Sequence, residues 1–377
     1  MIKVLIVDDS ALMRRQFSQL LEAQGDIRVV WARNGQEAVE MNQSERPDVV
    51  TLDINMPVMD GIEALSLIMA TRPVPVIMLS SLSSKGALLT FEALALGAVD
   101  YMTKPSGTIS LSIDVIASEL VDKIREAAKL KVVAPSHGAG LLKKVQHSSR
   151  QASSRNPTSS YGMTPNDQAW ATSSDRRGLP RQISEGLVVI GVSTGGPCTL
   201  EKILQTLPAG FAHPIVVIQH MPGSFTGPFA ERINRSCALE VLEVNEPTAL
   251  LPGKVYIARG DADAVVTRRM GRLTMLPRPE TDGHPWHPSV ELMGRSVLEH
   301  CKATNVLAIM LTGMGYDGAD AFAALKEKGA KTIAESEASC VVFGMPRELI
   351  ERGGASTVLN AKDIGAQMIQ WGNGLWP

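Results

Sequence analysis

A serine in a glycine-rich turn is the first residue of this chain that is placed for nucleophilic chemistry. The run GVSTG, with Ser193 at its centre, fits the pattern G-x-S-x-G and begins at the end of the apolar, strand-like segment 187–191. Glycines permit a sharp turn that exposes the hydroxyl, and a helix starting here would aim N–H groups at a developing oxyanion. The rival interpretation is a phosphate-binding turn, although neither G-x-x-x-x-G-K-[ST] nor G-x-G-x-x-G occurs here.

A serine nucleophile needs a base, and His220 is the best-placed histidine. It follows the apolar segment 214–219, so it ends a strand, as Ser193 does, and parallel strands end at one edge of a sheet. His213 precedes the same strand and points to the opposite edge. The remaining histidines lie in a Ser-rich segment (His137, His147), in a helix (His300) or in a loop, where they stay second choices (His284, His287).

An acid at a third strand end would complete the arrangement. Asp317 lies in the glycine-rich run that follows the predicted strand 305–311. A carboxylate there would orient His220 and stabilise its imidazolium. Local sequence is equally consistent with Asp317 as the N-cap of a helix over 319–328. No histidine follows residue 300, so the order serine, acid, histidine with this acid is impossible, which argues against an ordinary lipase-like fold.

Acids, a hydroxyl and a lysine end successive strands in the first third of the chain. Asp8 and Asp9 follow the first predicted strand, and Asp53 ends the third. Carboxylates gathered at one edge repel one another unless a cation such as Mg²⁺ lies between them, and Asp53 is a plausible phosphoryl acceptor. Ser80 and Lys104 end the fourth and fifth strands, where both could contact a phosphoryl group. Helix capping would explain one such acid, but not the whole set.

Strand and helix alternate in both halves of the chain, which predicts an α/β fold. In the first half, strands are expected at 3–7, 28–32, 49–53, 74–79 and 99–102. They predict a doubly wound, five-stranded parallel sheet. In the second half, strands are expected at 187–191, 214–219, 241–244, 255–258, 305–311 and 331–334, with helices at 199–207, 290–301 and 319–328. This half is predicted to be a Rossmann-like α/β domain with a mostly parallel sheet. Turn signals at 251–253 and 259–261 predict a hairpin insertion.

The two halves are separated by a segment of different character. Residues 131–185 contain paired serines, four prolines and no sustained apolar period, so they predict a flexible linker. Eight basic and three acidic residues give this segment a net charge of +5. The charge predicts either a solvated linker, which we favour, or an electrostatic tether to an acidic partner. Tyr161 and Trp170 are too few aromatic residues for base stacking.

Composition limits the class of protein. With 37 Lys and Arg against 39 Asp and Glu, the net charge of the 377-residue chain is −2, which excludes a polyanion binder along the whole chain but not a local basic patch, and we expect no nucleic-acid partner. Its 44% hydrophobic content is that of a globular protein, and its apolar runs are too short to cross a membrane. The sequence shows no secretory leader, and its four cysteines lack metal-ligand spacing. We therefore expect a cytoplasmic protein with reduced thiols and no membrane insertion.

The first third resembles the receiver domain of bacterial response regulators. The resemblance spans about residues 1–125 and rests on VDDS at 7–10, LDINMPVMDG at 52–61, Ser80 and TKP at 103–105. It implies phosphotransfer from a histidine kinase to Asp53. It also implies a Mg²⁺ site and a set of switch residues. The implied Mg²⁺ ligands are Asp8, Asp9, Asp53 and the carbonyl of Asn55, and the implied switch residues are Ser80, Tyr101 and Lys104.

The second half resembles the catalytic domain of chemotaxis protein-glutamate methylesterases, the CheB family. The resemblance runs over residues 186–372, after a linker at 126–185, and rests on GVSTGG at 191–196, QHMP at 219–222, YIA at 256–258 and LTGMGYDGA at 311–319. It implies hydrolysis of γ-glutamyl methyl esters on chemoreceptor helices, with release of methanol, and deamidation of selected glutamines. It also implies a CheA-type kinase as phosphodonor, and hydrolysis without a cofactor.

The resemblance implies an acyl-enzyme mechanism under control of the receiver. Ser193 would attack the side-chain carbonyl while His220, oriented by Asp317, removes its proton. N–H groups near Thr194 and Gly195, with the region of Met314, would hold the oxyanion. The unphosphorylated receiver would cover the cleft of Ser193, and phosphorylation would open it. Two rivals remain: a domain that binds without turnover, and a hydrolase of a different ester or amide.

One stretch departs from the family pattern. The family commonly carries the run His-Arg-Pro-Ser-Val-Asp ahead of a helix. This chain has Trp286-His287-Pro288-Ser289-Val290-Glu291, so the arginine is missing. If this loop contacts the receptor, we expect the substrate preference of this chain to differ.

Overall fold

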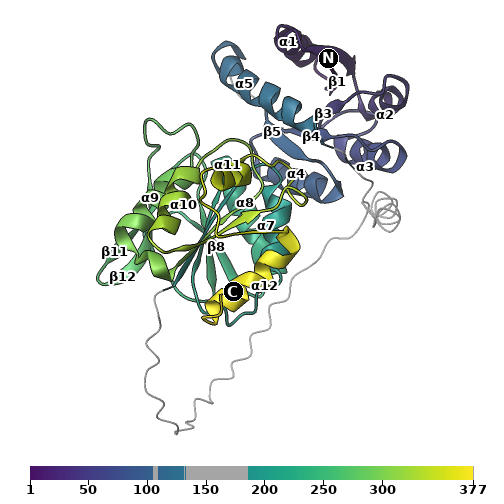
Figure 1. Cartoon of the computed structure of the whole chain (residues 1–377). Coiled ribbons are helices and arrows are strands. Elements are labelled where there is room, and N and C mark those ends of the chain that lie inside the picture. Colours follow the sequence, from purple (N-terminus) through teal and green to yellow (C-terminus); the bar gives the residue numbers. More distant parts are fainter. Residues whose placement is uncertain (105–108, 131, 133–185, 377) are drawn as a thin grey trace, which may run out of the picture. The chain divides into compact units, whose positions relative to one another are not determined.

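Parallel strands build the first sheet, whose order is β2-β1-β3-β4-β5. Figure 1 labels β1, β3, β4 and β5. Every neighbouring pair in it is parallel. The strands are β1 (Ile2–Val7), β2 (Ile27–Ala32), β3 (Val49–Asp53), β4 (Val76–Ser80) and β5 (Asp100–Thr103). The helices are α1 (Ala11–Glu22), α2 (Gly35–Ser44), α3 (Gly61–Thr71), α4 (Ser84–Leu96) and α5 (Ile109–Ala127). The predicted five-stranded doubly wound sheet is confirmed.

The local sequence explains these elements. All residues of β3 and β4 are buried, as expected for central strands of a sheet that helices cover on both faces. Side chains cap the helices that follow the strands: Ser10 accepts a hydrogen bond from the N–H of Met13, and Asp60 accepts one from that of Glu63. These caps therefore determine where α1 and α3 begin.

A second sheet of seven parallel strands forms the second half, in the order β15-β14-β13-β6-β7-β10-β8. The strands are β6 (Leu187–Val192), β7 (Ile215–Gln219), β8 (Glu240–Val244), β10 (Lys254–Ala258), β13 (Val306–Met310), β14 (Lys331–Glu335) and β15 (Thr357–Leu359). The helices are α7 (Gly196–Leu204), α8 (Gly223–Ser236), α9 (Val290–His300), α10 (Ala319–Glu327), α11 (Met345–Glu351) and α12 (Ala361–Gly372), and a 3₁₀ turn spans Ala303–Asn305. The predicted α/β architecture is confirmed here too.

The hairpin insertion lies later in the chain than predicted. The turn signals at 251–253 and 259–261 flank β10, which pairs in parallel with β7 and β8. The hairpin is instead β11 (Asp263–Arg269) with β12 (Arg272–Arg278), and β12 also pairs with β9 (Thr248–Ala249). Its turn is Met270-Gly271, where both residues have positive φ, as a two-residue hairpin turn requires. The predicted turns are loops that lead into and out of a parallel strand.

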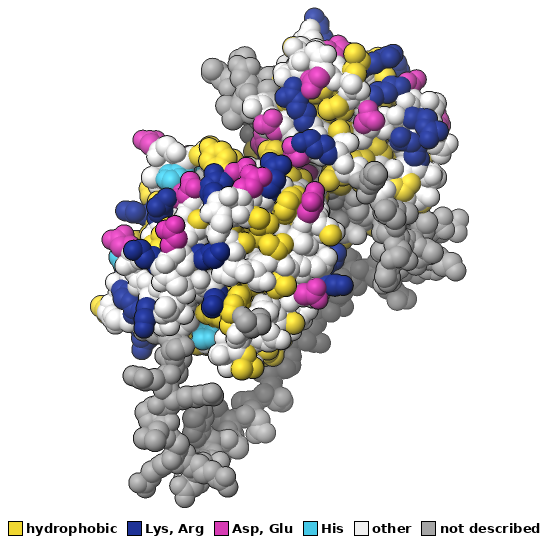
Figure 2. Space-filling model, in the orientation of Figure 1, with side chains coloured by type: hydrophobic (Ala, Val, Ile, Leu, Met, Phe, Trp, Pro, Cys, Tyr) yellow, Lys and Arg dark blue, Asp and Glu magenta, His cyan; other side chains and the backbone are white. Residues whose placement is uncertain are grey.

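The computed structural model describes residues 1–104, 109–130, 132 and 186–376, and both halves belong to one compact unit. Most of the predicted linker, 126–185, lies outside the described residues, although α5 continues to Ala127 and so includes its first two residues. None of the described helices is long and apolar enough to cross a membrane. On the face shown in Figure 2, acidic and basic side chains are interspersed, in keeping with the balanced composition.

The order of the second sheet determines which loops meet. Strand β6 lies between β13 and β7, and all three run in the same direction. The loops after their carboxyl ends therefore meet at one edge of the sheet. Ser193 follows β6, His220 follows β7, and the glycine-rich run that contains Asp317 follows β13.

Candidate active site

Ser193 occupies the turn between β6 and α7. Its N–H donates to the carbonyl of Thr312 at 3.0 Å, and its carbonyl accepts from the N–H of Gly196 at 2.8 Å. Gly195 has φ +78°, and a Cβ at this position would lie 2.5 Å from Cβ of Val341. The turn therefore requires glycine at 195, both for its backbone conformation and for space. Helix α7 begins immediately after it, as the G-x-S-x-G pattern predicted.

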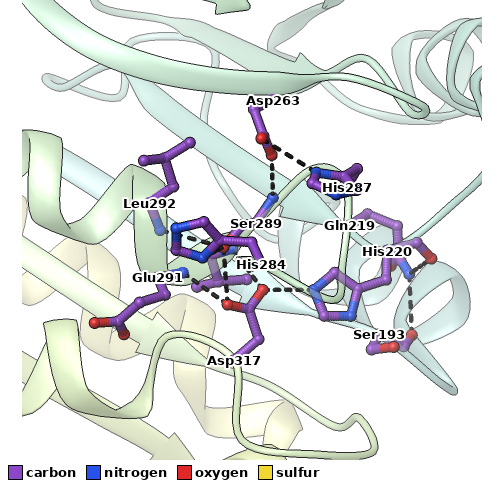
Figure 3. Close-up of polar contacts among 11 residues, drawn as sticks. Ser193, Gln219, His220, Asp263, His284, His287, Ser289, Glu291, Leu292 and Asp317 are labelled. Atoms are coloured by element: carbon purple, nitrogen blue, oxygen red, sulfur yellow. Dashed lines mark hydrogen bonds and ion pairs between the residues drawn. The ribbon is translucent and has the colours of Figure 1, made fainter. Parts of the chain in front are cut away.

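His220 and Asp317 form a hydrogen-bonded pair beside this turn. Nε2 of His220 lies 2.8 Å from Oδ2 of Asp317. The other ring nitrogen, Nδ1, is buried and has no hydrogen-bond partner among the described residues. In Figure 3 the imidazole lies between Asp317 and Ser193. The arrangement thus leaves Nδ1 as the nitrogen available to the serine.

The start of helix α9 binds the carboxylate of Asp317. Oδ1 accepts from the hydroxyl of Ser289 at 3.0 Å and from the N–H of Glu291 at 2.9 Å, and Oδ2 accepts from the N–H of Val290 at 2.6 Å. Burial acts to raise the pKa of Asp317, but the hydrogen bond and charge of His220, together with the N–H groups, outweigh it and hold the pKa below its ordinary value. Asp317 therefore remains an anion.

The alternative role of Asp317 as the cap of α10 does not match the contacts. The N-cap residue of α10 is Gly318, and no side chain caps this helix. Asp317 instead connects the start of α9 to His220, and it is only 3% exposed.

A buried glutamine holds the serine and histidine turns together. Nε2 of Gln219 donates to the carbonyl of Ser193 at 3.0 Å and to that of His220 at 3.1 Å. Gln219 is 1% exposed and ends strand β7. Gln219 belongs to the QHMP run at 219–222, but the motif predicts no role for it. A polar side chain at the end of an otherwise apolar strand was the available signal.

The predicted oxyanion residues lie beside Ser193. Thr194 and Gly195 follow it directly, at the start of α7. Met314 follows Gly313, at which a Cβ would lie 2.8 Å from Cβ of Ser193, so this loop passes against the serine side chain. The N–H groups of Ser193 and Gly313 already donate, to Thr312 and Val342. Donors for an oxyanion must therefore come from the other N–H groups of these two loops.

Asp263 anchors the loop in which the sequence departs from the family run. It is 1% exposed and accepts from the N–H of Ser289 at 3.0 Å, from that of Thr281 at 2.8 Å and from Nδ1 of His287 at 3.1 Å. His284 lies 3.4 Å from the hydroxyl of Ser289. His284 and His287, the second choices for the base, therefore contact Ser289 and Asp263 and help to hold the loop that binds Asp317 (Figure 3). No role was predicted for Asp263, because it lies in no recognisable motif.

The first half brings its three acids together as predicted. Carboxylate oxygens of Asp8, Asp9 and Asp53 lie within 4.8 Å of one another. Nζ of Lys104 lies 2.7 Å from Oδ2 of Asp8 and 2.8 Å from Oδ2 of Asp53. Burial raises the pKa of Asp53, and Lys104 only partly offsets this. Three oxygen donors of this kind suit a hard divalent cation, because one lysine does not balance three carboxylates. Asn55 lies two residues after Asp53 and is exposed.

The predicted switch residues lie in or directly after the neighbouring strands β4 and β5. Ser80, fully buried, ends β4, and Lys104 follows β5. Tyr101 lies within β5 and is 7% exposed. Its ring stacks on that of Phe225 in α8, with centroids 5.2 Å apart and planes inclined by 3°.

Comparisons with known proteins find relatives for both halves of the chain. The family model of the response regulator receiver domain matches residues 4–117, and that of the CheB methylesterase matches residues 188–368. Protein-glutamate methylesterase/protein-glutamine glutaminase 3 of Rhodospirillum rubrum is 48% identical over 98% of this chain and 96% of its own length. Protein-glutamate methylesterase/protein-glutamine glutaminase 2 of Rhodopseudomonas palustris is 45% identical over 99% of each.

Both relatives align with nearly the whole chain, and the two family models cover its five-stranded and its seven-stranded sheet in order. The resemblance drawn from the sequence is thereby confirmed. The chain belongs to the CheB methylesterase family, with a response regulator receiver domain ahead of its methylesterase domain.

Proposed function

We propose that this chain hydrolyses γ-methyl esters of glutamate on methyl-accepting chemoreceptors and deamidates selected glutamines there. The observation that carries the proposal is the 2.8 Å contact between His220 Nε2 and Asp317 Oδ2, which leaves Nδ1 for the hydroxyl of Ser193. The names of the relatives give the substrate class. The substrate segments are receptor helices.

Ser193 is the nucleophile of the proposed reaction. Nδ1 of His220 accepts the hydroxyl proton while Oγ attacks the ester or amide carbonyl. Asp317 holds the imidazole in the tautomer with hydrogen on Nε2 and stabilises the imidazolium that forms. The carbonyl oxygen becomes an oxyanion, to which N–H groups near Thr194, Gly195 and Met314 donate.

The intermediate then collapses into an acyl-enzyme. The C–O or C–N bond breaks as His220 gives its proton to the methoxy or amino group, which leaves as methanol or ammonia. A water molecule attacks the acyl-serine with His220 as base, which yields glutamate and free Ser193. Both reactions share these steps and differ only in the leaving group. None of them calls for a cofactor.

The receiver accepts a phosphoryl group from a CheA-type histidine kinase. A carboxylate oxygen of Asp53 attacks phosphorus and forms an acyl phosphate, and the kinase histidine leaves. Asp8, Asp9, Asp53 and the carbonyl of Asn55 would hold Mg²⁺, which when bound offsets the negative charge of the transferred group. Lys104 pairs with the same carboxylates, and Ser80 lies at the next strand end.

We place the receiver at residues 1–125, the linker at 126–185 and the catalytic domain at 186–372.

Contacts within the compact unit support inhibition by the unphosphorylated receiver. The hydroxyl of Thr194, the neighbour of the nucleophile, donates to Oδ2 of Asp100 at 2.9 Å. Asp100 also pairs with Nζ of Lys123 at 2.6 Å, and the next residue, Tyr101, stacks on Phe225. Receptor access to Ser193 then requires these contacts to open. Phosphorylation of Asp53 would favour the open form, because Tyr101 is a switch residue.

Incubation of the full chain with methyl-labelled receptor membranes and a phosphodonor tests the function. The proposal predicts volatile methanol, at a rate that falls when the phosphodonor is omitted. A protein that only binds receptor would sediment with the membranes and release none. A small-molecule esterase would cleave methyl butyrate but leave the receptor label in place. Either of these results contradicts the proposal.

A further inference from the structure

A tryptophan of the departing loop lies against the catalytic histidine. The rings of Trp286 and His220 are stacked, with centroids 5.6 Å apart and planes inclined by 1°. Tyr316 meets the indole edge-on, with centroids 5.2 Å apart and planes at 84°. Both distances fall in the range in which aromatic rings attract one another. Besides its hydrogen bond to Asp317, the imidazole thus has an aromatic ring stacked against it.

The position of Trp286 is fixed from several sides. The next residue, His287, pairs with the buried carboxylate of Asp263 at 3.1 Å, and Ser289 donates its N–H to the same group at 3.0 Å. Gly315 has φ +86°, and a Cβ there would lie 2.8 Å from Cζ2 of Trp286, so only glycine leaves room for the indole. Trp286 is half-buried and held by its loop, rather than a side chain that lies free on the surface.

The contact falls in the stretch that departs from the family run. When the Pro-Ser-Val positions of the family run are superimposed on residues 288–290, Trp286 stands where the run has histidine. His287 stands in place of the arginine, and it is the residue that pairs with Asp263. The departure in sequence therefore coincides with the ring that covers His220.

The contact between Trp286 and His220 matters for the reaction because His220 becomes positively charged when it takes the serine proton. The imidazole is neutral before attack and positively charged once it holds the proton of Ser193. A cation within about 6 Å of an indole centroid is stabilised by the negative face of the ring. The stabilisation arises only after proton transfer, so it accelerates turnover without tightening substrate binding.

We propose that Trp286 is a positioning residue for His220, which it holds with Nδ1 toward Ser193 and stabilises when the ring carries the serine proton. The inference rests on the proposed Ser193–His220 chemistry but not on the identity of the substrate. It therefore admits a test that needs no receptor.

Three variants of the full chain separate the aromatic contribution from packing. Trp286→Met and Trp286→Leu keep an apolar side chain but lose the π face, whereas Trp286→Phe keeps a ring. Trp371→Leu is the matched control, because Trp371 also contacts a histidine: its ring centroid lies 4.8 Å from that of His213. His213 precedes strand β7, whereas His220 follows it, so this contact lies at the opposite edge of the sheet. Two quantities are measured with phosphodonor present: the rate constant for inactivation of Ser193 by a fluorophosphonate, and kcat and KM for methanol release.

The expected loss for Trp286→Met and Trp286→Leu is about tenfold in the inactivation rate and in kcat, with KM within about twofold of wild type. Trp286→Phe should stay within about threefold. Trp371→Leu should leave both rates near wild type. If one apolar variant does not fold, as judged by circular dichroism, the other decides.

An unchanged inactivation rate in the apolar variants overturns the inference. So does a rise in KM at constant kcat, which would mean that the indole contacts substrate instead of positioning His220. Equal losses in Trp286→Phe and Trp286→Met would assign the effect to shape alone and also contradict it. Absence of methanol release from the wild-type protein would refute the proposed function, while the fluorophosphonate rates would still test the role of Trp286.

Discussion

Asp317 accepts a hydrogen bond from His220 Nε2 at 2.8 Å while its carboxylate also binds the first N–H groups of helix α9. The same side chain thus orients the base and joins two segments that are far apart in sequence. Its anionic state is stabilised by the N-terminus of a helix, where negative charge is favourable. Both the activity and the acid stability of the protein should therefore depend on it.

Replacing Asp317 with Asn should lower kcat for methanol release by about 10³–10⁴-fold, because an amide cannot hold His220 in the required tautomer or stabilise its charge. KM should change little, since the acid does not contact substrate. Asp320→Asn is a suitable control, because Asp320 lies nearby in α10 and is exposed. A kcat within tenfold of wild type would exclude Asp317 from the catalytic arrangement.

The acid stability of the catalytic domain should also depend on Asp317. Its pKa is lower in the folded protein than in the unfolded chain, so its contribution to stability is fully present above the unfolded pKa of about 4 and is lost as the pH falls through the folded value. In urea unfolding, the difference in free energy between wild type and Asp317→Asn should shrink from pH 7 to pH 3. A difference in unfolding free energy that stays constant or widens on acidification would contradict a lowered pKa of Asp317 in the folded protein.

Gln219 should prove to be a positioning residue. In Gln219→Glu a carboxylate would face the carbonyl oxygens of Ser193 and His220, and the two hydrogen bonds of 3.0 and 3.1 Å would be lost. We expect kcat to fall by about 10²-fold, because small displacements of reacting groups cost this much. The expected KM is that of wild type. Wild-type kcat in a folded Gln219→Glu protein would show that the serine and histidine turns keep their positions without the two hydrogen bonds from Gln219.

Opening the contact at Thr194 should raise basal activity. Asp100→Ala combined with Lys123→Met removes the acceptor of Thr194 without leaving Lys123 as an unpaired buried charge. Without phosphodonor, methanol release should rise by roughly fivefold or more toward the phosphorylated level. Asp26→Ala, which breaks the exposed pair with Arg125, should change nothing. An unaltered basal rate in the double variant would argue against inhibition through this contact.

Much of the fold followed from the sequence because its strands are short apolar runs with polar or glycine-rich ends. Strands β1 to β8, β10, β13 and β14 lie within two residues of their predicted bounds. The hairpin was misplaced because β11 ends in Arg268 and Arg269 and turns at Met270-Gly271, which carries no Asn-Gly or Asp-Gly signal. No element was predicted for α8, α11, β15 and α12, and of these α11 and β15 have only seven and three residues, too few to show a clear period.

The candidate site was predictable where it depends on strand ends. Ser193, His220 and Asp317 each follow a parallel strand, so topology alone brings them to one edge. Asp263 and Trp286 depend instead on how a long loop packs, and nothing local in the sequence encodes that packing. The ring orientation of His220, with Nε2 toward the acid, likewise depends on tertiary packing that the local sequence does not encode.

Transfer of the acyl group to Ser193 is tested by methanol release from methyl-labelled receptor membranes with Ser193→Ala in the phosphorylated full chain. We expect a rate at least about 10³-fold below wild type, because the nucleophile is lost while the fold is kept. A Ser193→Ala protein that retains most of the wild-type rate would contradict it.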